Sequence, residues 1–271
     1  MRRVVRAVLC GLALQAAAVF SAEPAAAGDC KAQAIKVLKA ASPNGYAVFQ
    51  QVGDKAFFHA WLDCDDAQYG LPTAVHESLH HITGEADAYP LIGGGMLKRP
   101  PENRTLPAPS RIAHQFRPSV FVSTYLQPGN ATAASDFRYL LDELNAYTHD
   151  LDTAIALADR RNPDVQLSHR DGLAALMSFV ALYVEAAGQN TATWTALRDR
   201  PIRTAFVSLW DQAERTMLAS CGIPEIGSED RSFLGKLCGA GPQAALGRLL
   251  GRAPVCPRAC LVVGPKTASR E

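Results

Sequence analysis

The chain has few of the features that nucleic-acid-binding and membrane-spanning proteins require. Among its 271 residues, 27 are Lys or Arg and 26 are Asp or Glu, so the formal net charge is only +1. It has no basic stripe and no run of Arg or Lys interleaved with aromatic residues, so we expect no nucleic-acid partner. Beyond the N-terminal segment, no apolar run is long enough to cross a bilayer, so we expect no membrane span. No internal repeat is visible.

The one extended apolar run lies at the N-terminus and predicts a secretory signal peptide. Basic residues among the first six positions precede an apolar run over residues 7–20, and small residues follow up to Ala27. This order, ending in an A-x-A cleavage site, is typical of signal peptides. We therefore expect residues 1–27 to be removed near Ala27 and the mature chain to be exported, either to the periplasm or out of the cell.

Cysteine is scarce, but its number is informative. The chain has seven cysteines, and Cys10 lies in the predicted signal peptide, which leaves an even number in the mature chain. An even number in an exported protein is typical of disulfide bonds. Clustering along the sequence favours the pairs Cys30–Cys64, Cys221–Cys238 and Cys256–Cys260. The competing interpretation is a thiolate zinc site near the C-terminus.

The segment Thr73–Ile82 contains the pattern HExxH. His76 and His80 are four residues apart, so on a helix they project from the same face and can chelate one metal ion. Imidazole nitrogens in such a site favour Zn²⁺. Glu77 lies one step round the helix, where it can act as a base toward a water on the metal. The segment therefore predicts a zinc site that performs hydrolysis.

The flanking residues favour a helix around this pattern. Pro72 suits the first turn of a helix, and Gly84 is placed as a C-terminal cap. Val75, Leu79 and Ile82 fall at helical spacing and give the helix an apolar stripe. The alternative is a half-buried helix whose two histidines only form hydrogen bonds.

A third zinc ligand is expected on a helix over residues 135–155, because a tetrahedral site needs three protein ligands and a water. Apolar residues recur there with a period near 3.6. Glu143 has apolar or aromatic neighbours three and four residues away, so it should face inward, where a carboxylate must be paired or bound to a cation. Asp142 should lie nearer the polar side, and His149 and Asp152 should be solvated. Alternatively, Glu143 only borders the apolar stripe.

The two motifs, HESLH and then DELNAY, together resemble the gluzincin branch of the zincin metallopeptidases. The likeness is greatest to small families whose second helix carries Glu-x-x-Ala-Tyr. The resemblance implies a zincin-like fold with His76, His80 and Glu143 as zinc ligands and Glu77 as general base. It also implies that Tyr147 lies near the metal and takes part in catalysis.

The chain departs from the better-known gluzincin pattern in two ways. The gap between His80 and Glu143 is long. No Asn precedes Glu143, and Tyr147 stands where an Asp is expected, so the carboxylate that usually supports a ligand histidine is unassigned. Ala146 would let the two metal-binding helices approach closely. The metzincin branch fits poorly, because Gly84 is followed by no His at the required distance.

Hydrolysis also needs a hydrogen-bond donor for the oxyanion of the tetrahedral intermediate. Tyr147 is the first choice by motif. His114, Tyr89 and His169 are open alternatives, and for each of them a structural role is the simpler interpretation.

The predicted fold is α+β and mostly helical, with a small sheet ahead of the HExxH helix that could hold an extended substrate by strand addition. The expected elements are a helix over residues 32–40, strands over 46–51, 56–62 and 119–126, a loop or loose hairpin over 89–109, and helices over 171–187 and 193–219, with Pro201 bending or dividing the last.

These observations predict a signal peptide (1–27), a zincin-like catalytic domain (28–220) and a cysteine-containing, loop-rich C-terminal extension (221–271). The predicted function is an exported zinc-dependent hydrolase, specifically a metallopeptidase that acts on a peptide or protein substrate. The alternatives are a zinc-binding protein without catalysis and a disulfide-bonded interaction module in which HExxH is accidental.

Overall fold

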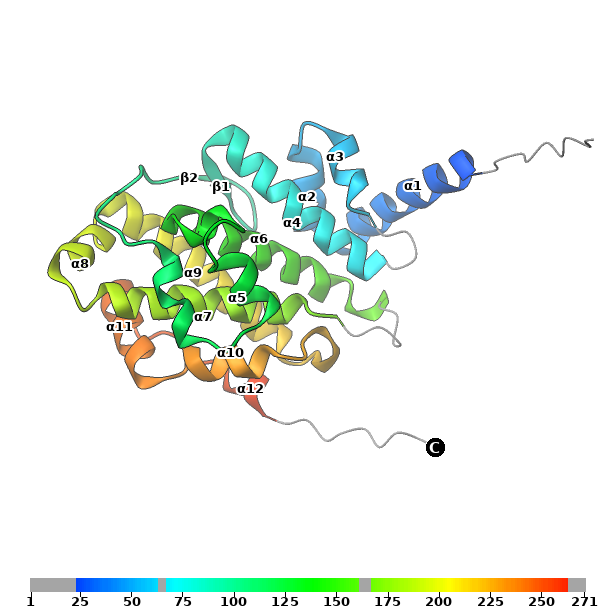
Figure 1. Ribbon diagram of the computed structural model, residues 1–271. Helices are drawn as coiled ribbons and strands as arrows, with labels where there is room; N and C mark the ends of the chain where they lie inside the picture. Colours follow the sequence, from blue (N-terminus) through cyan, green and yellow to red (C-terminus); the bar gives the residue numbers. More distant parts are fainter. Residues whose placement is uncertain (1–22, 63–66, 161–166, 263–271) are drawn as a thin grey trace, which may run out of the picture.

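The computed structural model describes residues 23–62, 67–160 and 167–262, and over these residues the protein is mostly helical with one two-stranded sheet, as expected (Figure 1). None of the helices in these ranges is sufficiently long and apolar to cross a membrane. Most of the predicted signal peptide, residues 1–22, lies outside the described residues.

The helices are α1 (Glu23–Ala41), α2 (Pro43–Gln51), α3 (Lys55–Ala60), α4 (Ala67–Ala86), α5 (Val120–Tyr125), α6 (Phe137–Ala156), α7 (His169–Ala187), α8 (Thr191–Leu197), α9 (Arg200–Ser220), α10 (Asp230–Leu237), α11 (Ala240–Leu250) and α12 (Arg258–Leu261). The short 3₁₀ helices are η1 (Pro109–Gln115), η2 (Thr132–Ala134), η3 (Ala158–Arg160) and η4 (Pro224–Ile226).

The sheet follows the HExxH helix and does not precede it. Strands β1 (Ala88–Pro90) and β2 (Met96–Lys98) form an antiparallel hairpin directly after α4, which lies within the predicted loop or loose hairpin. Its turn contains three glycines with positive φ, a conformation that residues with a Cβ rarely adopt. The prediction of a sheet ahead of α4 was therefore wrong.

The segments predicted as the first two strands form α2 and α3 because each begins at a strong N-cap. The Ser42 hydroxyl accepts a hydrogen bond from the Gly45 N–H, and Pro43 occupies the first turn of α2. The Asp54 carboxylate accepts from the Ala56 N–H at the start of α3. Such caps satisfy backbone donors that are otherwise unpaired and stabilise a helix by about 1 kcal/mol, so they outweigh the strand preference of the aromatic and branched residues that follow.

A similar cap explains the third wrong strand. The Ser119 hydroxyl accepts from the Val122 N–H, and residues 120–125 form α5. The predicted division near Pro201 is confirmed, because α8 ends at Leu197 and Pro201 lies in the first turn of α9. There, the missing N–H of proline removes no helical hydrogen bond.

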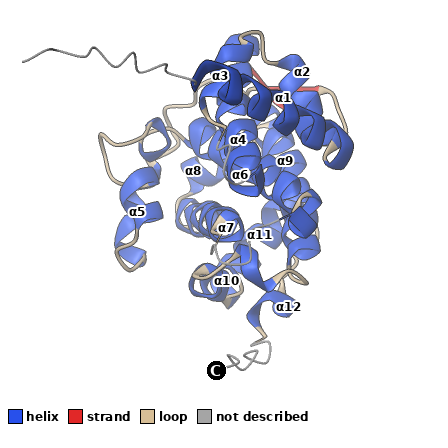
Figure 2. Ribbon diagram, turned by 90° about the vertical axis from the view of Figure 1, so that its right-hand side faces the viewer, coloured by secondary structure: helices blue, strands red, loops and turns tan. Residues whose placement is uncertain are grey.

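Helix α6 lies at the centre of the molecule, between α4 on one side and α7 and α9 on the other. Figure 2 shows α4, α6 and α7 stacked in this order. The main core forms where α6, α7, α9, α10 and α11 meet, and a smaller core joins α1–α4 to α6. Ala146 belongs to the smaller core and is fully buried against α4, in agreement with its expected role in close helix packing.

The C-terminal segment is helical and packs against α7, although the sequence predicted a loop-rich extension. Its disulfides are Cys221–Cys260 and Cys238–Cys256, so the predicted pairs Cys221–Cys238 and Cys256–Cys260 were wrong. Helix α10 separates Cys221 from Cys238, and α11 then returns the chain so that Cys256 meets Cys238 and Cys260 meets Cys221. Cys30 is disulfide-bonded, and its predicted partner Cys64 lies outside the described residues.

Two adjacent residues in the first turn of α7 fasten this C-terminal segment. The buried Asp171 carboxylate accepts hydrogen bonds from the backbone N–H groups of residues 228–230 and from the Ser228 hydroxyl. The Arg170 guanidinium binds the Asp230 carboxylate and two carbonyls at the end of α9. A buried charge is tolerated only when it is paired in this way, so these contacts fix α7 relative to α10.

Candidate metal centre

The HExxH pattern lies in the middle of α4, a continuous 20-residue helix. The helix starts earlier and ends later than the sequence predicted, so Pro72 and Gly84 lie inside it. Residues 67–71 precede Pro72, and Leu71 is fully buried against the smaller core, which explains why the helix extends past its proline. His76 and His80 lie on one face of α4, in agreement with their spacing.

The three predicted ligands come together between α4 and α6. The Nε2 atoms of His76 and His80 are 3.2 Å apart. The Oε2 atom of Glu143 lies 3.8 Å from the first and 3.3 Å from the second. Within the part of the chain that is described, this is the group of His, Cys, Asp and Glu side chains that could hold a metal ion, and its ligand atoms all lie within 4.8 Å of one another.

Asp142 supports the second histidine. Its Oδ2 atom lies 2.8 Å from Nδ1 of His80, and only 5% of the residue is exposed. The expectation that Asp142 lies on the polar side of its helix was wrong. Burial opposes protonation of His80, but its interactions with Asp142 and Glu143 outweigh burial and raise its pKa well above the usual value. A carboxylate behind a ligand histidine fixes the ring and leaves Nε2 for the metal.

The environment of His76 favours the neutral imidazole that a metal requires. Burial lowers the pKa of His76 well below its usual value, and the neighbouring His80 and His169 lower it further. Its Nδ1 atom lies 3.9 Å from Oδ2 of Asp150. The same carboxylate binds His169, whose Nδ1 atom lies 2.7 Å from Oδ1.

Glu77 lines a pocket next to the three candidate ligands. Burial raises the pKa of Glu77, while His80 opposes this rise, and a raised pKa brings a carboxylate closer to the range that suits a general base. The pocket has a volume of about 170 Å³. Its lining residues come from α4, α5, α6 and the start of α7, and they are Tyr69, Thr73, His76, Glu77, Phe121, Tyr125, Tyr147, Asp150, Ser168 and His169.

Tyr147 lies against His76, the first of the two predicted ligand histidines. Its ring packs edge-on to that of His76 with centroids 4.5 Å apart, and its hydroxyl lies 2.8 Å from that of Tyr125. Burial raises the pKa of Tyr147 well above its usual value, so the hydroxyl keeps its proton. Gly172 on α7 makes room for this ring, because a Cβ there would lie 2.0 Å from a ring carbon.

Of the alternative oxyanion donors, only His169 lies at the pocket. The Tyr89 hydroxyl donates to the carbonyl of Arg138 and is buried with β1. His114 is exposed on η1 and does not line the pocket. The pairing of His169 with Asp150 was not predicted. Asp150 follows Glu143 by seven residues, or about two helical turns, and this spacing was the available signal that the two share a face.

His149 is buried, contrary to the expectation that it would be solvated. Only 3% of the residue is exposed, and its Nε2 atom lies 3.2 Å from the Pro90 carbonyl. Its neighbour Asp152 is half-buried and accepts a hydrogen bond from Asn44. His149 contacts β1 and Asp152 contacts α2. These elements lie elsewhere in the sequence, so the periodicity of α6 alone did not reveal that they bury the two side chains.

The buried His149 should make the fold sensitive to mild acid. Burial lowers its pKa to about 4. Between pH 6.5 and about 4 the unfolded chain therefore binds a proton that the folded chain does not, and the free energy of unfolding falls as the pH falls. The free energy of unfolding falls by about 3 kcal/mol in total over this pH range. His149→Gln, which can still donate to Pro90, should lose less stability between pH 7 and pH 5 than the wild type, as measured by urea denaturation. Equal losses would contradict this prediction.

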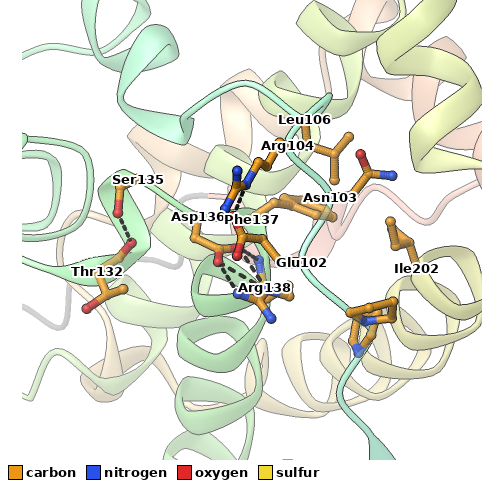
Figure 3. A pocket seen from close by; sticks show the side chains of 12 residues that line it. Glu102, Asn103, Arg104, Leu106, Thr132, Ser135, Asp136, Phe137, Arg138 and Ile202 are labelled. Atoms are coloured by element: carbon orange, nitrogen blue, oxygen red, sulfur yellow. Dashed lines mark hydrogen bonds and ion pairs between the residues drawn. The ribbon is translucent and has the colours of Figure 1, made fainter.

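A larger cavity of about 410 Å³ lies at the start of α6 (Figure 3). Its charged side chains pair with one another: Arg138 binds the Asp136 carboxylate, and Arg104 lies 3.3 Å from Glu102. Asp136 also caps α6 by accepting from the Arg138 N–H. Because these charged groups are already paired with one another, they are poorer candidates for catalysis or metal binding than the residues of the smaller pocket beside Glu77.

Comparison with known protein families, with curated proteins and with solved structures gave no match.

Proposed function

We propose that this protein is a zinc-dependent hydrolase, specifically a metallopeptidase that resembles the gluzincins, and that His76, His80 and Glu143 are its zinc ligands. The observation that carries the proposal is the meeting of two imidazole nitrogens and one carboxylate oxygen beside a pocket that Glu77 lines. A structural zinc site has four protein ligands and needs no neighbouring base. Three ligands with an adjacent carboxylate therefore favour catalysis over a structural role.

The donor set fits zinc. Two histidine nitrogens and one carboxylate oxygen are ligands that catalytic zinc sites use. The Oε2 atom of Glu143 is buried and has no hydrogen-bond partner, although two histidine nitrogens lie within 4 Å of it. An unpaired buried carboxylate oxygen is costly unless a cation compensates it. The support of His80 by Asp142 is also typical of zinc sites.

Zinc in such a site supplies a Lewis acid that polarises the substrate carbonyl and makes water acidic enough to attack at neutral pH. Glu77 accepts the proton of the attacking water and delivers it to the amine that leaves when the C–N bond breaks. The hydroxyls of Tyr125 and Tyr147 hold two protons and use one in their mutual hydrogen bond. The other proton is available to an oxyanion, in keeping with a catalytic role for Tyr147.

We also propose that the protein is exported. The predicted signal peptide supports this, and so do the disulfides Cys221–Cys260 and Cys238–Cys256, because disulfides persist in oxidising compartments. A peptide or protein in such a compartment would be the substrate.

Elemental analysis and a peptide digest test the proposed function. Protein purified without chelators should hold about one zinc ion per chain and should cleave a peptide library in a chelator-sensitive manner. The double variant His76→Ala/His80→Ala should hold none and should cleave nothing. Equal zinc content in the two proteins would refute the site. Zinc binding without any cleavage by the wild type would favour the non-catalytic zinc-binding protein.

A further inference from the structure

A cavity of about 340 Å³ lies beside the first turns of α9 and shares no lining residue with the pocket beside Glu77. The α9 residues that line it recur at intervals of three and four, so they form one face of the helix. The ends of α8 and α11 contribute one residue each. The lining consists of Arg198, Arg200, Arg203, Thr204, Val207, Ser208 and Leu250, all of them described residues, and it includes no carboxylate.

The three arginines of this cavity carry positive charge that the protein does not neutralise. Arg203 donates hydrogen bonds to the last two carbonyls of α11, which fix the side chain but leave its charge in place. Among the described residues, no carboxylate forms an ion pair with Arg198, Arg200 or Arg203. The nearest acid in the sequence, Asp199, lines the adjoining cavity together with Arg198 and Arg200 and pairs with neither.

Arg200 stands where a helix disfavours a cation. It is the first residue of α9, whose first turn contains no acidic side chain and whose N-cap residue, Asp199, makes no capping hydrogen bond with its side chain. The N-terminus of a helix carries partial positive charge, and Arg203 adds a like charge three residues later. By contrast, Arg198 and Arg203 lie at the C-terminal ends of α8 and α11, where a cation is favoured. An anion in the cavity would supply the counter-charge that Arg200 lacks.

The donors around the cavity match a phosphate group. A guanidinium binds phosphate through two parallel N–H···O hydrogen bonds, and the hydroxyls of Thr204 and Ser208 can donate to further oxygens. A phosphate dianion also compensates more of the positive charge than a carboxylate does. The volume of about 340 Å³ lies within the range of small-molecule sites, so there is space for more than the ion. Val207 and Leu250 offer apolar contact to the rest of a ligand.

We propose that this cavity binds the phosphate group of a small phosphorylated molecule, with Arg198 and Arg200 as the main phosphate ligands and Arg203 held beside them by α11. The site is separate from the candidate metal centre, and neither zinc nor hydrolysis is needed for it. In the simpler alternative, the three arginines only form the solvated face of a helix.

Isothermal titration calorimetry of the purified mature chain, in a buffer without phosphate, tests this site with phenyl phosphate, inorganic phosphate and acetate as probes. Phenyl phosphate should bind the wild type at one site and more tightly than inorganic phosphate, and acetate should not bind. Arg200→Gln should weaken binding of phenyl phosphate by at least about tenfold, the usual loss for a charge-assisted hydrogen bond. Arg198→Gln/Arg200→Gln should abolish binding. Arg215→Gln removes an exposed arginine of the same helix outside the cavity and should bind as the wild type does.

Thermal unfolding without phosphate gives an independent measure. Arg200→Gln should melt no lower than Arg215→Gln, because it removes a cation from the N-terminal end of α9. Phenyl phosphate should raise the melting temperature of the wild type, since it binds the folded chain, and should leave that of Arg198→Gln/Arg200→Gln unchanged. A lower melting temperature in Arg200→Gln than in Arg215→Gln would give Arg200 a structural role and overturn its assignment as an uncompensated cation.

Phosphate can also coordinate zinc, so the titrations are repeated with chelator and with His76→Ala/His80→Ala, and binding should be unchanged in both. Its loss would place the phosphate at the metal centre and overturn the site. So would a wild type that binds no phenyl phosphate, or equal binding by Arg198→Gln/Arg200→Gln. Tighter binding of inorganic phosphate than of phenyl phosphate would identify the free ion as the ligand. Co-sedimentation with vesicles of phosphatidic acid, without binding of phenyl phosphate, would identify a lipid headgroup, and either result would overturn the small phosphorylated molecule.

Discussion

Replacing Glu143 with alanine is expected to weaken zinc binding by more than about 100-fold, beyond the range typical of residues that only support a ligand. The carboxylate is one of three groups whose atoms meet between α4 and α6, and its Oε2 atom lies 3.3 Å from Nε2 of His80. Its removal leaves two histidines from one helix, which hold zinc less tightly than three ligands from two helices.

Competition with a chelating zinc indicator measures this effect, and two other carboxylates of α6 are the controls. Asp142→Asn should weaken zinc binding by about 10–100-fold, because it leaves His80 in place but removes the carboxylate behind it. Asp152→Asn should leave zinc binding unchanged, since this side chain binds Asn44 and not the ligands. If Glu143→Ala binds zinc as well as Asp152→Asn does, Glu143 is not the third ligand.

Replacing Glu77 with glutamine should reduce hydrolysis by about 10²–10⁴-fold, the usual contribution of a general base. Glutamine keeps the size and much of the hydrogen-bonding shape of glutamate, but its amide cannot accept a proton from water. Zinc content and thermal stability should barely change, because Glu77 lines the pocket and is not one of the three ligand residues.

The appropriate control is Glu85→Gln, a change of the same kind on the same helix. Glu85 is exposed and pairs with His81, away from the pocket, so this variant should digest the peptide library as the wild type does. Chelator-sensitive cleavage that persists undiminished in Glu77→Gln would remove Glu77 from the mechanism.

The meeting of His76, His80 and Glu143 could be predicted because each position depends on a local pattern. His76 and His80 belong to one helix, where spacing alone determines the face. Glu143 has apolar neighbours along its own helix, which indicate an inward side chain. Asp142 was misjudged because it is buried by a different helix, α4, whose His80 it contacts. The hydropathy pattern of one helix cannot show which of its polar residues a second helix covers.

The pairing of Asp150 with His169 and the disulfide pairing depend on tertiary packing. Asp150 meets His169 only because α6 and α7 pack side by side. Cys221 meets Cys260 only because α10 and α11 return the chain to the end of α9. The incorrect strand predictions have a local cause instead. Ser42 and Asp54 are recognisable in the sequence as helix-capping residues, but the aromatic residues that follow them were given more weight.

The order of residues at the start of α7 sets a condition on the assembly of the pocket during folding. His169 faces the pocket, while the next two residues bind a segment some sixty positions later in the chain. In a nascent chain that ends before residue 228, Asp171 lacks the donors that it binds in the folded protein. The meeting of the candidate ligands depends on the contact of α4 with α6, whereas the part of the wall that contains His169 depends also on the docking of the last part of the chain.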